Sequence, residues 1–170
     1  MHGVNHIALS VGDMKRTLAF YTGTMGLRLV GLFPMHGVLD AIHAFLDMGD
    51  GRLLSFIRFK DAAASIANVT TPAHPGMPSA IGSMHHVALN VSDEAALEAT
   101  KGRLQAAGVR VFGPIDHGFC ASIYLTGPDG EQVEVSCFTR PLDEREMDAD
   151  TLARLDITAP ELERMRRGAA

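Results

Sequence analysis

The sequence has little of what marks several large classes of protein. It contains only two cysteines, Cys120 and Cys137, without CxxC spacing, so we expect both thiols to stay reduced. No apolar run approaches the roughly 18 residues that a membrane-spanning helix needs. The N-terminus also lacks a basic segment followed by an apolar one. These absences predict a cytoplasmic protein with no membrane partner.

Positive charge is also scarce, which argues against a nucleic-acid partner. The 170 residues carry 15 lysines and arginines against 20 aspartates and glutamates, a net charge of -5. The basic cluster at residues 164–168 lies beside Glu161 and Glu163 and is expected to be a solvated helix face. At this length, and with 46% hydrophobic residues, the chain should form one globular domain or two small halves sharing a core.

What the sequence does contain is an internal repeat. Residues 4–31 and 84–113 share one order of features. Each begins with a strand that has a histidine near its start and continues with a helix that has an acidic start. Each ends with the pattern Gly-hydrophobic-Arg-hydrophobic-x-Gly. A second pair of matching segments, residues 45–59 and 124–138, follows at nearly the same offset. Two matches in the same order indicate a tandem repeat.

Each copy is predicted to form a strand, a helix and three further strands, a βαβββ module. The predicted fold class is therefore α+β. We expect the first module over residues 1–61, a linker rich in proline, glycine and small residues over 62–83, and the second module over 84–139. A short helical tail is expected over residues 140–170.

Capping residues mark the two module helices. Asp13 is expected to begin the first helix and Gly26 to end it. In the second copy either Ser92 or Asp93 can cap the helix, and Gly108 is expected to stop it.

The repeat places three potential metal ligands at matching positions. His6 aligns with His86, and Glu134 aligns with Ser55, which is not a ligand. For Glu134 alone, within the alternating strand 132–137, a solvent-exposed face would be the simpler interpretation. If the two copies pack about a pseudo-twofold axis, however, His6, His86 and Glu134 can converge on one cavity. Two imidazoles and one carboxylate form a facial set that leaves positions of an octahedral ion open.

These features resemble the vicinal oxygen chelate superfamily, which includes glyoxalases, bleomycin-resistance proteins and dioxygenases. The resemblance covers residues 3–138 and implies a cupped mixed sheet, built from both modules, around a divalent metal. It implies His6, His86 and Glu134 as the ligands. Type I extradiol dioxygenases and fosfomycin-resistance thiol transferases use such a set, whereas glyoxalase I usually takes a carboxylate from both modules, a pattern that Ser55 breaks.

A longer motif, from Ile115 to Glu134, is similar to the extradiol dioxygenase signature. Gly127 departs from it, standing where that family prefers Asp, Glu, Asn, Thr or Ala. The resemblance implies that Tyr124 hydrogen-bonds a substrate oxygen and that His117 orients the substrate or assists proton transfer. The alternatives are a solvated turn for His117 and an ordinary barrel aromatic for Tyr124.

A further histidine could serve in proton transfer. Many two-domain extradiol enzymes carry an acid–base histidine near the place where this chain has Leu54 and Ser55. His43 lies two residues before Phe45, which aligns with Tyr124, so its side chain should point into the same cleft. We expect His43 to replace that acid–base group or to contact substrate; a strand histidine without a role is the alternative.

The resemblance implies an Fe(II)-dependent extradiol ring-cleaving dioxygenase of aromatic catabolism, with Mn(II) able to substitute. Its substrates would be a catechol-type aromatic diol and dioxygen, and a homo-oligomer is expected. The alternatives are a glyoxalase-like isomerase or thiol transferase of the same fold, and a metal-free protein that sequesters a ligand. The sequence leaves open whether the modules of one chain pair with each other or with those of a second chain.

Overall fold

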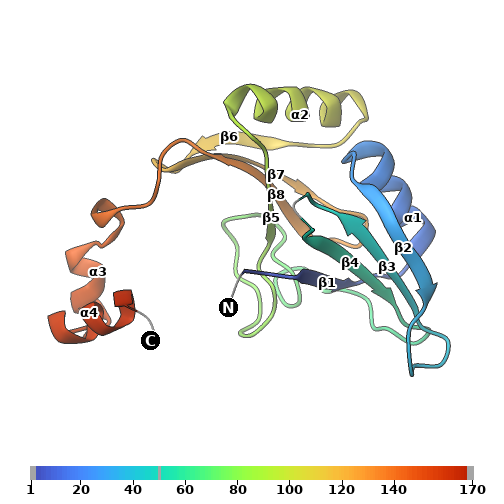
Figure 1. Cartoon of the computed structure of the whole chain (residues 1–170), viewed down its shortest axis with the longest axis horizontal. Helices are drawn as coiled ribbons and strands as arrows, with labels where there is room; N and C mark the ends of the chain where they lie inside the picture. Colours follow the sequence, from blue (N-terminus) through green and yellow to red (C-terminus); the bar gives the residue numbers. More distant parts are fainter. Residues whose placement is uncertain (1–2, 50, 168–170) are drawn as a thin grey trace. The chain divides into compact units, whose positions relative to one another are not determined.

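The computed structural model describes residues 3–49 and 51–167, and the chain divides into two compact units after Thr139. The first unit holds two four-stranded mixed sheets with helices (Figure 1). The elements of the first module are β1 (His6–Ser10), α1 (Met14–Leu18), a π-helical turn η1 (Ala19–Thr24), β2 (Arg28–Pro34), β3 (Ile42–Asp47) and β4 (Leu53–Arg58). Those of the second are β5 (Val87–Asn90), α2 (Glu94–Ala106), β6 (Phe112–Asp116), β7 (Cys120–Thr126) and β8 (Gln132–Phe138).

The two sheets have the same topology. Their strand orders are β1-β4-β3-β2 and β5-β8-β7-β6, with the first pair of each sheet parallel and the others antiparallel. Ala8 pairs with Ser55 in the first sheet, as Ala88 pairs with Glu134 in the second. The predicted α+β fold of two tandem βαβββ modules is therefore confirmed, and the pairing register matches the sequence alignment of the copies.

The helix boundaries follow their capping residues. Asp13 and Asp93 are the N-caps, and each carboxylate accepts a hydrogen bond from a backbone N–H in the first helical turn. Of the two candidates for the second cap, Asp93 fills the position and Ser92 hydrogen-bonds to it. The regular α-helix ends earlier than predicted, at Leu18, and continues as η1 to Thr24; Gly26 follows the C-cap of η1 with φ of +83°, a conformation that glycine adopts without steric cost.

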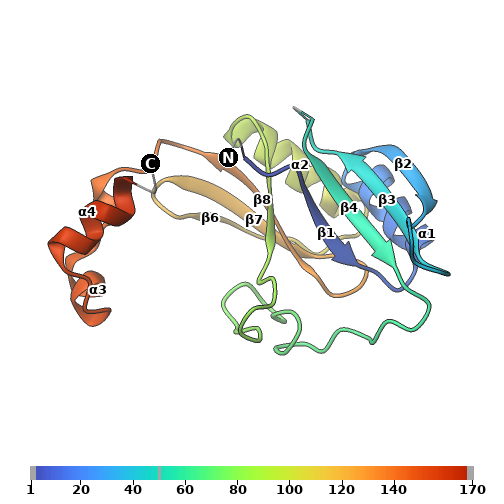
Figure 2. The same cartoon turned by 60° about the horizontal axis from the view of Figure 1, so that its bottom comes forward.

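The segment between β4 and β5 is irregular. Residues 59–86 contain one isolated bridge, between Ala67 and Thr71, and their path is seen most fully in Figure 2. The second unit carries a short 3-10 turn (Glu144–Glu146), α3 (Ala149–Arg154) and α4 (Ala159–Arg167). Among the described residues, none of the helices combines the length and the apolar character needed to cross a membrane.

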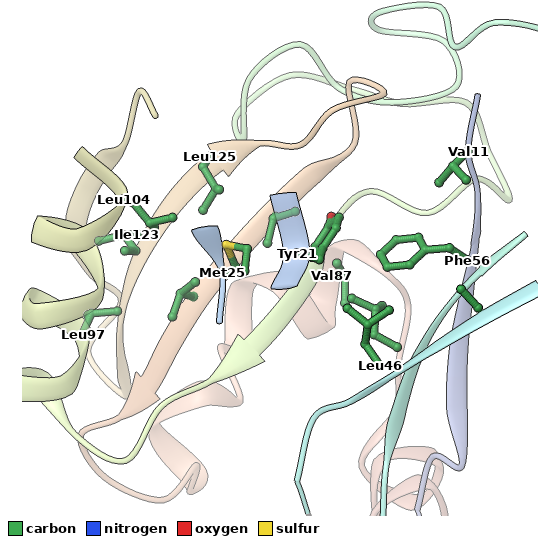
Figure 3. Packing of buried hydrophobic residues seen from close by; sticks show 14 of the residues in the cluster. Val11, Tyr21, Met25, Leu46, Phe56, Val87, Leu97, Leu104, Ile123 and Leu125 are labelled. Atoms are coloured by element: carbon green, nitrogen blue, oxygen red, sulfur yellow. The ribbon is translucent and has the colours of Figure 1, made fainter. Parts of the chain in front are cut away.

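One hydrophobic core serves both modules. On β4 the side chains of Leu54 and Phe56 point into it, and on β8 those of Val133 and Val135 do so, as strand alternation requires. Figure 3 shows that the core also contains residues of α2, such as Leu97 and Leu104, and Tyr21 of the η1 turn. Tyr21 packs against Phe56 with ring centroids 4.6 Å apart. Both cysteines are buried and unpaired, as expected.

Polar contacts also join the modules. The Tyr21 hydroxyl donates a 2.8 Å hydrogen bond to Glu131, on the turn between β7 and β8. Asp129 on the same turn forms a 2.7 Å ion pair with Arg16 of α1. Burial raises the pKa of the Glu131 carboxyl and that of the Tyr21 hydroxyl. The hydroxyl therefore stays protonated at neutral pH and can donate to the buried carboxylate.

We expect Tyr21→Phe to lower the free energy of unfolding by about 1–3 kcal/mol at pH 8, because it leaves Oε1 of a partly buried carboxylate without its donor, while Oε2 keeps the backbone N–H of Asp129. The folded-state pKa of Glu131 is raised, so the stability linked to its protonation is present at low pH and lost as the pH rises through that pKa. The donor matters most to the ionised form, so the variant's deficit should shrink at pH 4. Urea denaturation at both pH values measures it.

The exposed Phe138 provides the control, since Phe138→Leu should change stability by less than about 0.5 kcal/mol. A Tyr21→Phe deficit that is equal at pH 4 and pH 8 would contradict the ionisation argument.

Candidate metal centre

Glu134 lies on β8 with its side chain on the face opposite the core. It is 6% exposed, so the solvent-facing alternative for this residue is wrong. Its Oε2 lies 3.1 Å from Nε2 of His86, which directly precedes β5, and the Ser122 hydroxyl donates to Oε1. A buried carboxylate is stable only when a positive group or hydrogen-bond donors compensate it. Here the hydroxyl meets one oxygen, and the imidazole edge faces the other.

Tyr124 and His117 lie on the same face of the second sheet. Tyr124 pairs directly with Glu134 in the β7–β8 ladder, and its hydroxyl oxygen is 2.9 Å from Nε2 of His117. The rings of Tyr124 and His86 are also neighbours, with centroids 6.4 Å apart. Burial, followed by the nearby charge of Glu134, raises the pKa of Tyr124 to about 12. The hydroxyl is thus protonated at neutral pH and able to donate a hydrogen bond.

The equivalent face of the first sheet carries the other candidates. Nε2 of His43 lies 2.6 Å from Oγ of Ser55, and the rings of His6 and His43 both neighbour Phe45. His43 therefore points to the face that the strand parity predicted. Burial, and then the positive charge of His6, lower the pKa of His43. His43 is accordingly a neutral imidazole at pH 7 and could accept a proton; its role stays a prediction.

One chain does not bring the three predicted ligands together. Within residues 3–49 and 51–167, no three His, Cys, Asp or Glu side chains are grouped closely enough to hold a metal ion. A cavity of about 540 Å³ is lined by the end of β1, residues 9–12, and by His86 near the start of β5. His6 lies four residues before Ser10, roughly 13 Å back along the strand at about 3.3 Å per residue. Of the three predicted ligands, His86 and Glu134 are in contact within one chain. A metal site that also includes His6 stays a prediction.

Two contributors were missed at the sequence level. Ser122 hydrogen-bonds Glu134, and it lies two residues before Tyr124, so strand parity could have identified it. His85 contacts His86 with 2.9 Å between their Nδ1 atoms. No sequence period predicts that contact, because the two histidines precede β5 in irregular backbone.

Known proteins share this architecture. Residues 3–135 match the family model of the Glyoxalase/Bleomycin resistance protein/Dioxygenase superfamily. No curated protein matches the chain.

Solved structures similar to this chain include a glyoxylase/bleomycin resistance protein/dioxygenase domain from a Frankia species, with 14% identity and a TM-score of 0.67, covering 81% of this chain and 98% of that one. A glyoxalase/dioxygenase from Nostoc punctiforme has 19% identity and a TM-score of 0.61, covering 82% and 92%. An antibiotic-binding protein from a Streptomyces species has 21% identity and a TM-score of 0.60, covering 82% and 98%. These structures share the fold, and the family match spans most of both modules. The chain therefore belongs to the Glyoxalase/Bleomycin resistance protein/Dioxygenase superfamily.

Proposed function

We propose that this protein is an Fe(II)-dependent extradiol dioxygenase that cleaves the ring of a catechol-type aromatic diol. The observation that carries the proposal is the 3.1 Å contact between His86 and Glu134 on the face that also holds Tyr124 and His117. These are two metal ligands, a protonated hydroxyl and a further imidazole, the groups that binding and deprotonating a diol require. The match of residues 115–134 to the extradiol signature supports the same assignment.

The third ligand in this proposal is His6 of a second copy of the chain. Each sheet buries one face in the shared core and carries its candidate ligands on the other. On β2 of the first sheet, large apolar side chains remain exposed on both faces: Leu29, Val30, Leu32 and Phe33. A twofold dimer that pairs the first module of one chain with the second module of the other would cover such surface. It would form two identical sites, each with ligands from both chains.

The protein side chains divide the remaining work. Bound Fe(II) would supply Lewis-acid and one-electron chemistry between the diol and dioxygen. Tyr124, protonated at neutral pH, donates a hydrogen bond to a substrate oxygen, and His117, held by that hydroxyl, exchanges a proton at the substrate. His43 is neutral and faces the same cleft in the proposed dimer, where it accepts a proton from the diol.

Metal-free ligand binding is the second candidate. It is favoured by the absence of a three-ligand group within one chain over the described residues, and by the cavity of about 540 Å³. The similar Streptomyces structure is an antibiotic-binding protein. An isomerase that needs a second carboxylate is less well supported, because Ser55 holds the equivalent position and its hydroxyl contacts His43.

Anaerobically purified protein is expected to bind Fe(II) and then convert catechol, 3-methylcatechol or 2,3-dihydroxybiphenyl to a yellow ring-opened product with matching oxygen uptake. Glu134→Ala should weaken Fe(II) binding by more than about 100-fold, since it removes a ligand. Glu98→Ala, which changes an exposed glutamate of α2, should bind Fe(II) like wild type.

The other outcomes discriminate among the candidates. Fe(II) uptake with turnover of a thiol adduct and of no diol would replace the dioxygenase with the isomerase or transferase. A protein that takes up neither Fe(II) nor Mn(II) but binds flat aromatic ligands would establish the metal-free candidate instead.

The two-chain metal centre makes a separate prediction. His6→Ala and Glu134→Ala should each bind little Fe(II) alone, but refolding an equal mixture should restore about a quarter of the wild-type sites. Half of the dimers would then be mixed, and one of the two sites in each mixed dimer would have all its ligands. Metal analysis of the refolded mixture, with each variant refolded alone as control, measures this. A mixture no better than its components would contradict the two-chain centre.

His43→Ala is expected to lower kcat by about 10²- to 10⁴-fold, because it removes the proposed general base. The Fe(II) content should be unchanged, since His43 is not a ligand. His36→Ala, which alters an exposed loop histidine, is the matched control. A kcat of His43→Ala within threefold of the wild-type kcat would contradict the acid–base role.

A further inference from the structure

A second cavity, of about 420 Å³, lies at one end of the second sheet. Its walls come from residues 73–75 of the irregular segment between the modules, from residues between 108 and 112 at the entry to β6, and from the facing ends of β7 and β8. The volume falls within the roughly 300–1,000 Å³ of small-molecule pockets. Of the residues discussed for the candidate metal centre, only Tyr124 lines this cavity.

The lining carries a positive charge and no negative one. Arg110 is exposed at the cavity, and over residues 3–49 and 51–167 no side chain pairs with its guanidinium. None of the residues around the cavity is an aspartate or a glutamate, although acidic residues outnumber basic ones in the chain. An unpaired guanidinium without a competing carboxylate favours an anionic ligand, and its planar fork matches a carboxylate.

Aromatic side chains form the apolar part of the wall. The rings of His74 and Phe112 meet edge to face with centroids 4.9 Å apart, although both side chains are exposed. Nδ1 of His74 accepts a 3.3 Å hydrogen bond from the backbone N–H of Gly76, which holds the imidazole in place. Phe20 and Tyr124 add two more rings to the lining. The cavity therefore offers ring contacts to a flat aromatic ligand.

A buried amide supplies a neutral polar group. Gln132 is 4% exposed, and its Nε2 donates a 3.1 Å hydrogen bond to the Thr126 hydroxyl. Thr126 lines this cavity and not the one of about 540 Å³, so the amide points toward β7. Within the described part of the chain, Oε1 of Gln132 has no donor. A buried amide oxygen is stable when a donor completes it, and a ligand hydroxyl can do so.

The strand order sets the distance between the charged and the neutral end. β6 and β8 flank β7, so they are two strand spacings apart, roughly 10 Å. Phe112 pairs with Tyr124 on one side of β7, and Gln132 pairs with Thr126 on the other. A single six-membered ring with polar groups at opposite ends, reached by the long arginine side chain, can span this distance.

We propose that this cavity is a binding site for a small aromatic carboxylate that carries a hydroxyl group opposite the carboxylate. Arg110 binds the carboxylate, and the rings of Phe112 and His74 contact the aromatic ring. Gln132 accepts a hydrogen bond from the hydroxyl group. The inference goes beyond the proposed function, because none of these side chains is a proposed metal ligand and binding requires no metal.

Isothermal titration calorimetry of the full-length, chelator-treated protein with 4-hydroxybenzoate tests the site. We expect a Kd of about 1 mM or lower, and an affinity that falls with added salt because Arg110 is exposed. 4-Hydroxybenzyl alcohol, which lacks the charge, should bind about tenfold more weakly. No binding of 4-hydroxybenzoate, or equal binding of the alcohol, would overturn the inference.

Two variants assign the ends of the ligand. Arg110→Gln should weaken binding of 4-hydroxybenzoate by about tenfold and leave that of the alcohol unchanged. Arg154→Gln, which changes an exposed arginine of α3, is the matched control and should bind like wild type. Wild type should prefer 4-hydroxybenzoate over benzoate by about fivefold, and Gln132→Leu should abolish this preference. Each readout compares two ligands on one protein, so a general loss of folding cannot imitate it.

The position of the ligand has its own measurement. In ¹⁵N-labelled protein, 4-hydroxybenzoate should shift the backbone amide signals of residues 73–76 and 108–112. Shifts confined to other parts of the chain would contradict the assignment of the cavity, whatever the affinity. If Gln132→Leu does not fold, Arg110→Gln and these shifts decide the outcome.

These results are separable from those for the proposed activity. Metal uptake and ring opening without 4-hydroxybenzoate binding would refute the aromatic-acid site and leave the dioxygenase standing. Binding of 4-hydroxybenzoate that depends on Arg110, in a protein that opens no diol ring, would keep the site and refute the dioxygenase.

Discussion

The burial of both sheets against one hydrophobic core is the constraint on which the rest of the structure depends. A strand alternates its side chains between two faces, so committing one face of each sheet to the core assigns the other face to the candidate ligands. Tyr21 lies at the centre of this arrangement, packed on Phe56 and hydrogen-bonded to Glu131 of the other module. The same packing that joins the modules therefore fixes which side chains lie on the face of the candidate site.

A buried carboxylate then decides the character of the second sheet. Glu134 has little contact with water, and its stability in this position depends on the Ser122 hydroxyl and on the His86 imidazole, whose Nε2 lies 3.1 Å from Oε2. Tyr124 follows from the same environment, because burial beside that carboxylate keeps its hydroxyl protonated. The polar groups on this face thus depend on one another, and changing one alters the protonation or orientation of the next.

Much of the fold could be predicted because the sequence contains two copies of the same βαβββ module. The repeat predicts that Ser55 and Glu134 hold equivalent positions, which the pairing registers confirm, and capping aspartates mark the start of both module helices. The placement of His6 relative to His86 could not be predicted in the same way. A repeat identifies equivalent positions, but packing of the helices and sheets between the copies decides whether those positions meet within one chain. The His85 contact was equally inaccessible, since it depends on irregular backbone near Met77.

The serine at position 55 has a consequence for how a ligand could sit. If both modules supplied a carboxylate, the two walls of the cleft in the proposed dimer would offer equivalent contacts. A flat ligand could then bind equally well in two orientations related by a half turn. Ser55, which is hydrogen-bonded to His43, removes that equivalence. The wall formed by the first module presents a neutral hydroxyl and an imidazole, whereas the wall formed by the second module presents Glu134. A planar diol entering the cleft would thus meet two chemically different ends, and only one of its two orientations would bring its more acidic oxygen toward the neutral base.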